Sequence, residues 1–122
     1  MENKKNFYIN GKWTAPLEPR NYKVIDPSNE EICAEISLGG KKDVDKAVGA
    51  AKKAFQTWAF SKKEERLELL EKLYVVYKKR WAEMAKLISL EMGAPMKFST
   101  EMQAATGASH IKSFKNILKD LI

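Results

Sequence analysis

The sequence predicts a mixed fold of the α/β class, α+β in this segment, with two β-hairpins over residues 1–40 and three to four amphipathic helices over residues 41–122. Two observations support this prediction. An Asn-Gly turn and an alternating apolar strand occur before residue 40. Residues 59–92 contain no glycine or proline, and their apolar positions recur at steps of three and four, the spacing of one helix face.

The first hairpin is predicted around Asn10 and Gly11. Aromatic and β-branched residues flank this pair on both sides, in residues 7–9 and 12–14. Asparagine and glycine both accept a positive φ, which a two-residue type I′ turn requires at both central positions. A strand is therefore expected on each side of the turn.

The second hairpin is predicted from a strand over residues 22–26 and an alternating segment after it. Pro27 ends the first strand, and residues 28–31 turn the chain. Ile32, Ala34 and Ile36 then alternate with more polar residues, which is the period of a half-buried strand.

A first helix is predicted after Gly39 and Gly40. Asp43 and Asp45 place negative charge in its first turn, where the helix dipole favours an anion. Its expected apolar face consists of Val44, Val48, Ala51, Phe55 and Trp58.

The long run that follows is predicted to form two helices with a bend at residues 78–80. Ser61 and Glu64 have the spacing of a capping box, which predicts a helix start at Ser61. Gly93 can take the left-handed conformation that ends many helices, and Pro95 cannot continue the ladder. The expected apolar stripe is Leu67, Leu70, Tyr74, Tyr77, Trp81, Met84 and Ile88.

A last helix is predicted from about Glu101. Thr100 and Gln103 have the capping-box spacing. The expected inner face consists of Ala104, Ala108, Ile111, Phe114, Leu118 and Leu121.

Composition excludes several classes of protein. The net charge is +6, but only three of the 22 basic residues are arginine, and the lysines alternate with acids on predicted helix surfaces, so nucleic-acid binding is not expected. No apolar run is long enough to span a membrane, so no membrane partner is expected. Cys33 is the only cysteine, which excludes an internal disulfide and favours a reducing, cytoplasmic location.

The residues give no catalytic or cofactor-binding site. Cys33 lies in the middle of a predicted strand without a neighbouring cation, and His110 lies in a predicted helix without an orienting partner, so both are interpreted as structural. The sequence contains neither Gly-x-Gly-x-x-Gly nor a phosphate loop ending in Gly-Lys-Ser/Thr.

Several segments resemble the aldehyde dehydrogenase superfamily. Residues 7–13 resemble the family's Phe-x-Asn-Gly-x-Trp opening, and residues 43–48, 50–51 and 54–55 resemble its first helix. Residues 66–73 and 82–85 resemble its second and third helices, and residues 90–95 resemble the Glu-x-Gly-x-Pro segment that closes the third. The sequence departs from the family pattern at Asp26, where asparagine is usual, and at Glu30, where glycine is usual. The resemblance covers nearly the whole chain but only the opening portion of the family's architecture.

The resemblance implies the front part of a cofactor-binding domain without its Rossmann-like sheet. It implies a parent enzyme that uses NAD or NADP to oxidise an aldehyde to a carboxylic acid through a cysteine thioester. The family's catalytic and cofactor-phosphate residues come later than the matched segments, so the chain alone is expected to bind no cofactor and to be inactive. The resemblance further implies a monovalent cation near Ile25 and Glu91.

Two hypotheses therefore follow from the sequence. In the first, the chain is the N-terminal portion of an aldehyde dehydrogenase, and its apolar helix faces contact the remainder of that enzyme. In the second, the chain is a stand-alone helical interaction or oligomerisation module that associates through the same faces. A weak basic nucleic-acid binder is a third reading, and it would show steeply salt-dependent binding.

Overall fold

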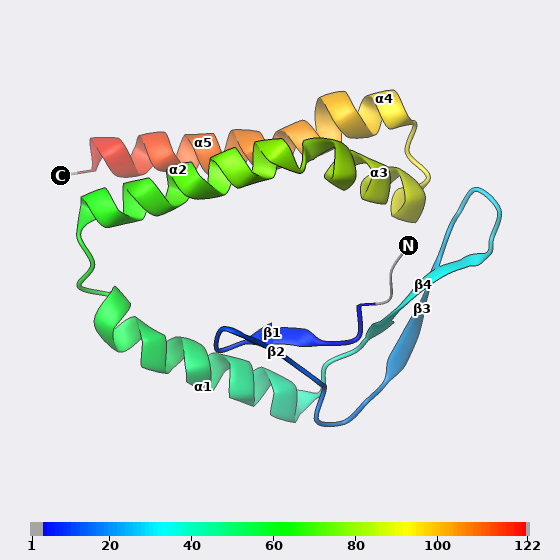
Figure 1. The fold of residues 1–122 in the computed structure, drawn as a ribbon, viewed down its shortest axis with the longest axis horizontal. Coiled ribbons are helices and arrows are strands. Elements are labelled where there is room, and N and C mark those ends of the chain that lie inside the picture. The colour runs from blue at the N-terminus through cyan, green and yellow to red at the C-terminus, as the bar shows by residue number, and fades with distance from the viewer. Residues whose placement is uncertain (1–3, 122) are drawn as a thin grey trace. The chain divides into compact units, whose positions relative to one another are not determined.

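The computed structural model describes residues 4–121 and divides into two compact units, Met1–Phe60 and Ser61–Ile122 (Figure 1). The first unit holds two antiparallel hairpins and one helix, and the second is helical. The predicted α+β class with two hairpins followed by amphipathic helices is confirmed. The first helix belongs to the unit of the hairpins, a grouping that the sequence did not predict.

Strands β1 (Phe7–Ile9) and β2 (Lys12–Thr14) form the first hairpin, with Tyr8 opposite Trp13. Asn10 and Gly11 have φ values of 53° and 74°, as the type I′ turn requires, so this prediction is confirmed. The rings of Tyr8 and Trp13 meet edge to face at 5.2 Å between centroids, a pair that stabilises the two short strands.

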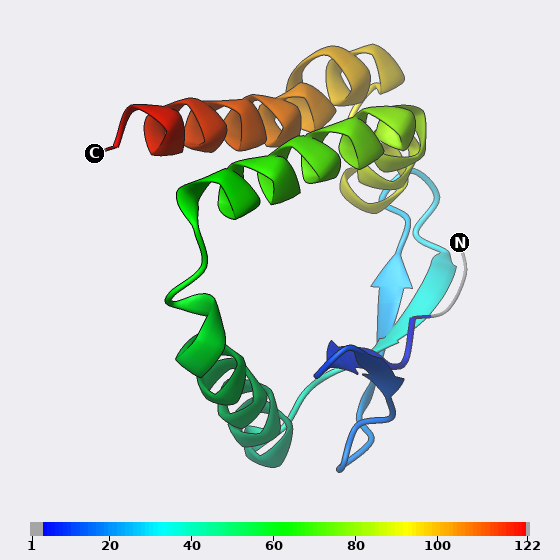
Figure 2. The same ribbon diagram turned by 60° about the vertical axis from the view of Figure 1, so that its left-hand side comes forward.

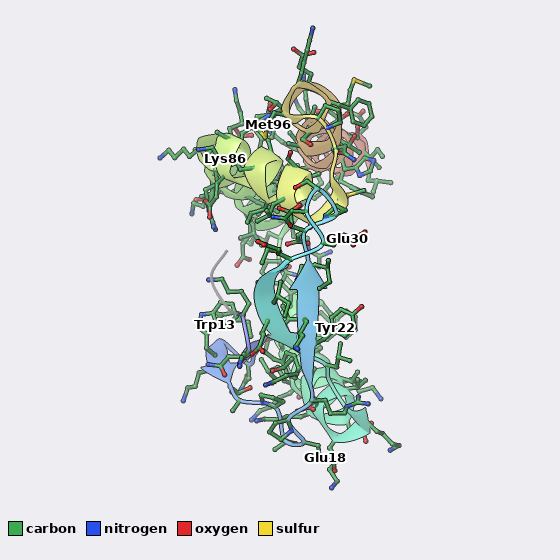
Figure 3. All side chains as sticks on the ribbon, turned by 90° about the vertical axis from the view of Figure 1, so that its right-hand side faces the viewer. Trp13, Glu18, Tyr22, Glu30, Lys86 and Met96 are labelled. Carbon is green, nitrogen blue, oxygen red and sulfur yellow. The ribbon has the colours of Figure 1, made fainter. Side chains whose placement is uncertain are left out.

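Strands β3 (Asn21–Ile25) and β4 (Ile32–Ser37) form the second hairpin, with an irregularity in the register between Val24 and Ile25. Glu30 lies at the turn of this hairpin (Figure 3) with a φ of 62°. The backbone N–H and hydroxyl of Ser28 donate to the Asp26 carboxylate at 2.8 and 2.7 Å, and these bonds, the hydroxyl first, lower the pKa of Asp26.

Replacing Glu30 by glycine is expected to stabilise the second hairpin by about 1 kcal/mol, because glycine takes a positive φ without the steric cost that a Cβ incurs. Exchange of the Asp26 amide, which donates to the Glu31 carbonyl at 2.9 Å, should slow about fivefold. Glu30→Ala is the control, since alanine keeps the Cβ. Equal exchange rates in the two variants would contradict this explanation.

Helix α1 (Lys41–Trp58) begins after Gly40, as predicted. Its alanine-rich side, Ala47, Ala50, Ala51 and Ala54, borders a shallow groove with the β1–β2 hairpin. The predicted apolar face is different: Val44, Val48 and Phe55 lie exposed within this unit.

Helices α2 (Lys63–Lys79) and α3 (Trp81–Met92) are separated at Arg80, whose φ and ψ of −100° and 9° are not helical, so the predicted break is confirmed. Gly93 ends α3 in the left-handed conformation with φ 68°, also as predicted. The predicted cap at the start of α2 is wrong. Its N-cap is Lys62, one residue too late for a box closed by Glu64, and the Ser61 hydroxyl instead accepts from the Arg66 guanidinium at 2.8 Å.

The last helical run begins at α4 (Met96–Phe98), continues through the π-helical segment η1 (Ser99–Gln103) and ends with α5 (Ala104–Asp120). The predicted cap at Thr100 is therefore wrong. Thr100 lies inside the run, where its hydroxyl donates to the Met96 carbonyl at 2.8 Å instead of capping a helix start.

Helices α2 and α5 lie side by side and antiparallel (Figures 1 and 2). Among the described residues of this unit, the buried positions are small residues, Ala85, Ser99, Ala104 and Ala108, which allow the helix backbones to approach closely. An ion pair joins Lys115 of α5 to Glu71 of α2, and Lys63 donates to the Leu121 carbonyl at 2.8 Å beyond the end of α5. The predicted inner position Phe114 is 63% exposed, contrary to expectation, whereas Ala104 and Ala108 of the same predicted face are buried and Ile111 and Leu118 are half-buried.

Candidate functional site

The best-defined polar site in the first unit is the N-terminus of α1. The carboxylate of Asp43, only 4% exposed, accepts from the backbone N–H of Leu17 at 2.9 Å and of Gly40 at 3.0 Å. These two hydrogen bonds, Leu17 first, lower the pKa of Asp43. The carboxylate thus ties the loop before β3 to the start of α1, a role that sequence analysis missed because the partner amide lies 26 residues away.

This arrangement bears directly on cofactor binding. A dinucleotide phosphate needs a helix N-terminus with free amides and, usually, a glycine-rich loop. At the glycine pair before α1, the Asp43 carboxylate already accepts the Gly40 amide, and its negative charge would repel a phosphate. The residues present at this helix start therefore do not fit a bound NAD or NADP.

Asp43 should titrate below the usual range of an aspartate, which is near pH 3.9. Because its folded-state pKa is lowered, the stabilisation that it provides is fully present above the unfolded value and is lost as the pH falls through the folded value. Shifts of the Leu17 and Gly40 amide resonances, followed against pH, should show this low midpoint, and Asp43→Asn should abolish the titration. A midpoint at or above 3.9 would disprove the assignment.

Cys33 and His110 are the two side chains that were considered as potential catalytic groups, and they lie in β4 and α5. Cys33 is half-buried in β4, and its thiol donates to the Val24 carbonyl at 3.4 Å, within the distance accepted for sulfur. His110 lies exposed on α5.

A small apolar pocket in the second unit lies where α2 meets α3. Leu73, Tyr77, Met84 and Leu87 line it, together with the pair of Arg80 and Glu83. Two hydrogen bonds of 2.8 Å join the guanidinium to the carboxylate, and they raise the pKa of Arg80. Because these charges are directed at each other, the pocket does not present an acid–base pair to a substrate.

The residues implied as cation ligands lie in separate units. Ile25 is the last residue of β3 and Glu91 is in the last turn of α3. Within residues 4–121, no group of three or more His, Cys, Asp or Glu side chains could hold a metal ion. The cation site therefore stays a prediction.

Large apolar side chains are exposed on both units of the described chain. In the first unit, Phe55 is 65% exposed on the same side of α1 as Val44 and Val48. In the second unit, Leu69, Leu73 and Val76 of α2 and Phe114 and Ile117 of α5 are also exposed. Side chains of this size are expected to contact other protein groups. None of the helices in the described chain is both long and apolar enough to cross a membrane.

Comparison with known proteins identifies the family. The profile of the aldehyde dehydrogenase family matches residues 13–121. The chain is 40% identical over 121 residues to 3-succinoylsemialdehyde-pyridine dehydrogenase from a Pseudomonas species, covering 98% of this chain and 25% of that protein.

Solved structures agree. An aldehyde dehydrogenase from Bartonella henselae matches the whole chain with a TM-score of 0.96 and 52% identity, over 26% of its own length. A mutant of aldehyde dehydrogenase C from Pseudomonas syringae, in complex with NAD+ and octanal, matches 98% of the chain with a TM-score of 0.95 and 35% identity, over 25% of its own length.

The chain therefore belongs to the aldehyde dehydrogenase family. It spans about a quarter of the length of the relatives that it matches and corresponds to the N-terminal part of their fold.

Proposed function

We propose that the chain is the N-terminal scaffold of an NAD(P)-dependent aldehyde dehydrogenase, a protein that oxidises an aldehyde to a carboxylic acid. The observation that carries the proposal is the family match over residues 13–121 together with 52% identity to a solved aldehyde dehydrogenase. The NAD+ complex of the Pseudomonas syringae relative supports use of a nicotinamide cofactor by the complete enzyme.

The contribution of this chain to that enzyme is structural. The Cys33 thiol donates to the Val24 carbonyl, His110 is exposed, and the Asp43 carboxylate accepts the Gly40 amide at the start of α1. Phe55 and Phe114, each more than 60% exposed, are the side chains that the remainder of the enzyme would cover. The single cysteine supports a cytoplasmic location for this enzyme.

The purified 122-residue chain should show no aldehyde-dependent reduction of NAD+ or NADP+. The measurement is absorbance of the reduced nicotinamide with a panel of aliphatic and aromatic aldehydes, and a complete aldehyde dehydrogenase serves as the positive control. Reproducible turnover that survives repurification would refute the scaffold assignment.

The second candidate function is a self-associating helical module, which the exposed apolar sides of α2 and α5 favour. Sedimentation over a concentration series separates the two candidates. Heterogeneous, concentration-dependent association supports the scaffold, because uncovered apolar surfaces associate with one another non-specifically and without a fixed stoichiometry. A defined small oligomer supports the module instead.

A further inference from the structure

The π-helical segment η1 interrupts an otherwise regular helical run between α4 and α5. At its end the backbone N–H of Ala104 donates to the Ser99 carbonyl, five residues earlier, whereas an α-helix pairs residues four apart. The turn therefore accommodates one inserted residue, and this residue rotates the side chains of α5 about the helix axis relative to those of α4, although both segments pair residues four apart.

Two aromatic side chains from the neighbouring helices donate hydrogen bonds to backbone carbonyls in and directly after the π-helical segment. The Trp81 indole Nε1–H, from the start of α3, donates to the Thr100 carbonyl at 3.0 Å. The Tyr77 hydroxyl, near the end of α2, donates to the Ala104 carbonyl at 2.8 Å. The two rings also contact each other edge to face, with centroids 6.2 Å apart, and this contact helps to hold both side chains in position.

The surroundings of these donors favour one register. A Cβ added to Gly107 would overlap the Tyr77 hydroxyl and lie 2.8 Å from the ring carbon Cζ, so only glycine fits opposite this ring. Moving α5 by one position would bring Thr106 or Ala108 to that place. Ser99 and Ala104, at the two ends of the π turn, are completely buried, which leaves no room for a larger side chain there.

We infer that Tyr77 and Trp81 form a clasp that holds the π turn and thereby fixes the rotational register of α5. The clasp determines that Ala104 and Ala108 are buried, while Phe114 and Ile117 stay exposed. Tyr77 and Trp81 are thus positioning residues. Their hydrogen bonds determine which side of α5 is buried and which apolar side chains of α5 are exposed. Without the clasp, regular α pairing would rotate α5 by about 100° relative to α4.

The test is to identify which carbonyl accepts the hydrogen bond of the Ala104 N–H in the 122-residue chain. NMR couplings across hydrogen bonds give this acceptor directly. In the unmodified chain the coupling should reach the Ser99 carbonyl carbon. The double variant Tyr77→Phe, Trp81→Phe keeps an aromatic ring at both positions but removes the two donors. In this variant the coupling should instead reach the Thr100 carbonyl carbon. Tyr74→Phe on the same helix is the control and should leave the acceptor at Ser99. An unchanged acceptor in the double variant would overturn the inference.

A second measurement needs no variant. Exchange of the Trp81 indole proton should be about tenfold slower than that of Trp13, whose side chain is exposed, because the Trp81 proton is held by the Thr100 carbonyl. Equal exchange at the two indoles would show that the clasp does not form, whatever the behaviour of the double variant.

Discussion

Phe55→Asp is expected to destabilise a chimera in which residues 1–122 replace the matching segment of the Bartonella henselae enzyme. In the chain considered alone, the Phe55 side chain is 65% exposed, so a carboxylate there would remain solvated. In a complete dehydrogenase we propose that this side of α1 is covered. An unpaired buried carboxylate would then cost at least ~3 kcal/mol, a large fraction of the stability of a typical domain.

The same substitution should therefore have opposite effects in two settings. It should lower the yield of soluble chimera and abolish its activity, whereas it should reduce the association of the isolated chain seen by sedimentation. Gln56→Asp is the matched control, because Gln56 is the exposed neighbour of Phe55 and the charge change is the same. If Phe55→Asp and Gln56→Asp chimeras were equally active, the proposed covering of α1 would be wrong.

Gly107→Ala is expected to destabilise the chimera by about 2 kcal/mol. In an open helix position this change is favourable by up to about 1 kcal/mol, since alanine is the better helix former. At Gly107 the new Cβ would overlap the Tyr77 hydroxyl, and either the ring or the helix backbone must move. The measurement is the free energy of unfolding in denaturant.

Gly49→Ala is the control for this prediction. Gly49 is an exposed residue of α1, and a Cβ added there would meet no atom within 4 Å. This variant should therefore be slightly more stable than the parent. Tyr77→Leu, which shortens the opposing side chain, should recover part of the loss in a double-mutant cycle. The steric explanation would be wrong if both glycine-to-alanine variants changed the free energy of unfolding in the same direction. It would also be wrong if the double-mutant cycle showed no coupling energy between positions 107 and 77.

Features set by short-range chemistry could be predicted from the sequence. The Asn10-Gly11 turn and the left-handed Gly93 follow from the conformations that these residues allow. The break at Arg80 lies within the predicted stretch of consecutive charged residues, and the alternation of Ile32, Ala34 and Ile36 identified β4 within one residue.

Features that depend on distant partners could not be predicted in this way. Ser61 and Thr100 each had the spacing of a helix cap, but a spacing of three residues also occurs inside helices and before them, and only the hydrogen bonds distinguish these cases. The π turn depends on donors from Tyr77 and Trp81, about 20 or more residues earlier. Gly107, an isolated glycine in a helical pattern, was the one local signal of the close contact there.

Similar reasons limited the prediction of the site. The placement of Cys33 in a strand and of His110 in a helix could be predicted from the neighbouring residues alone. The bond between the Asp43 carboxylate and Leu17 could not, because nothing in the sequence around Asp43 specifies a loop 26 residues away. The aldehyde dehydrogenase family was correctly predicted from motifs that extend along most of the chain.

The most direct test of the scaffold assignment is the activity of the unmodified chimera. With NAD+ or NADP+ and an aldehyde that the Bartonella henselae enzyme oxidises, its kcat/KM should lie within about tenfold of the parent value, because the chain contributes packing surfaces and no reacting group. A folded chimera of parental size and stability that oxidises no aldehyde would contradict this assignment.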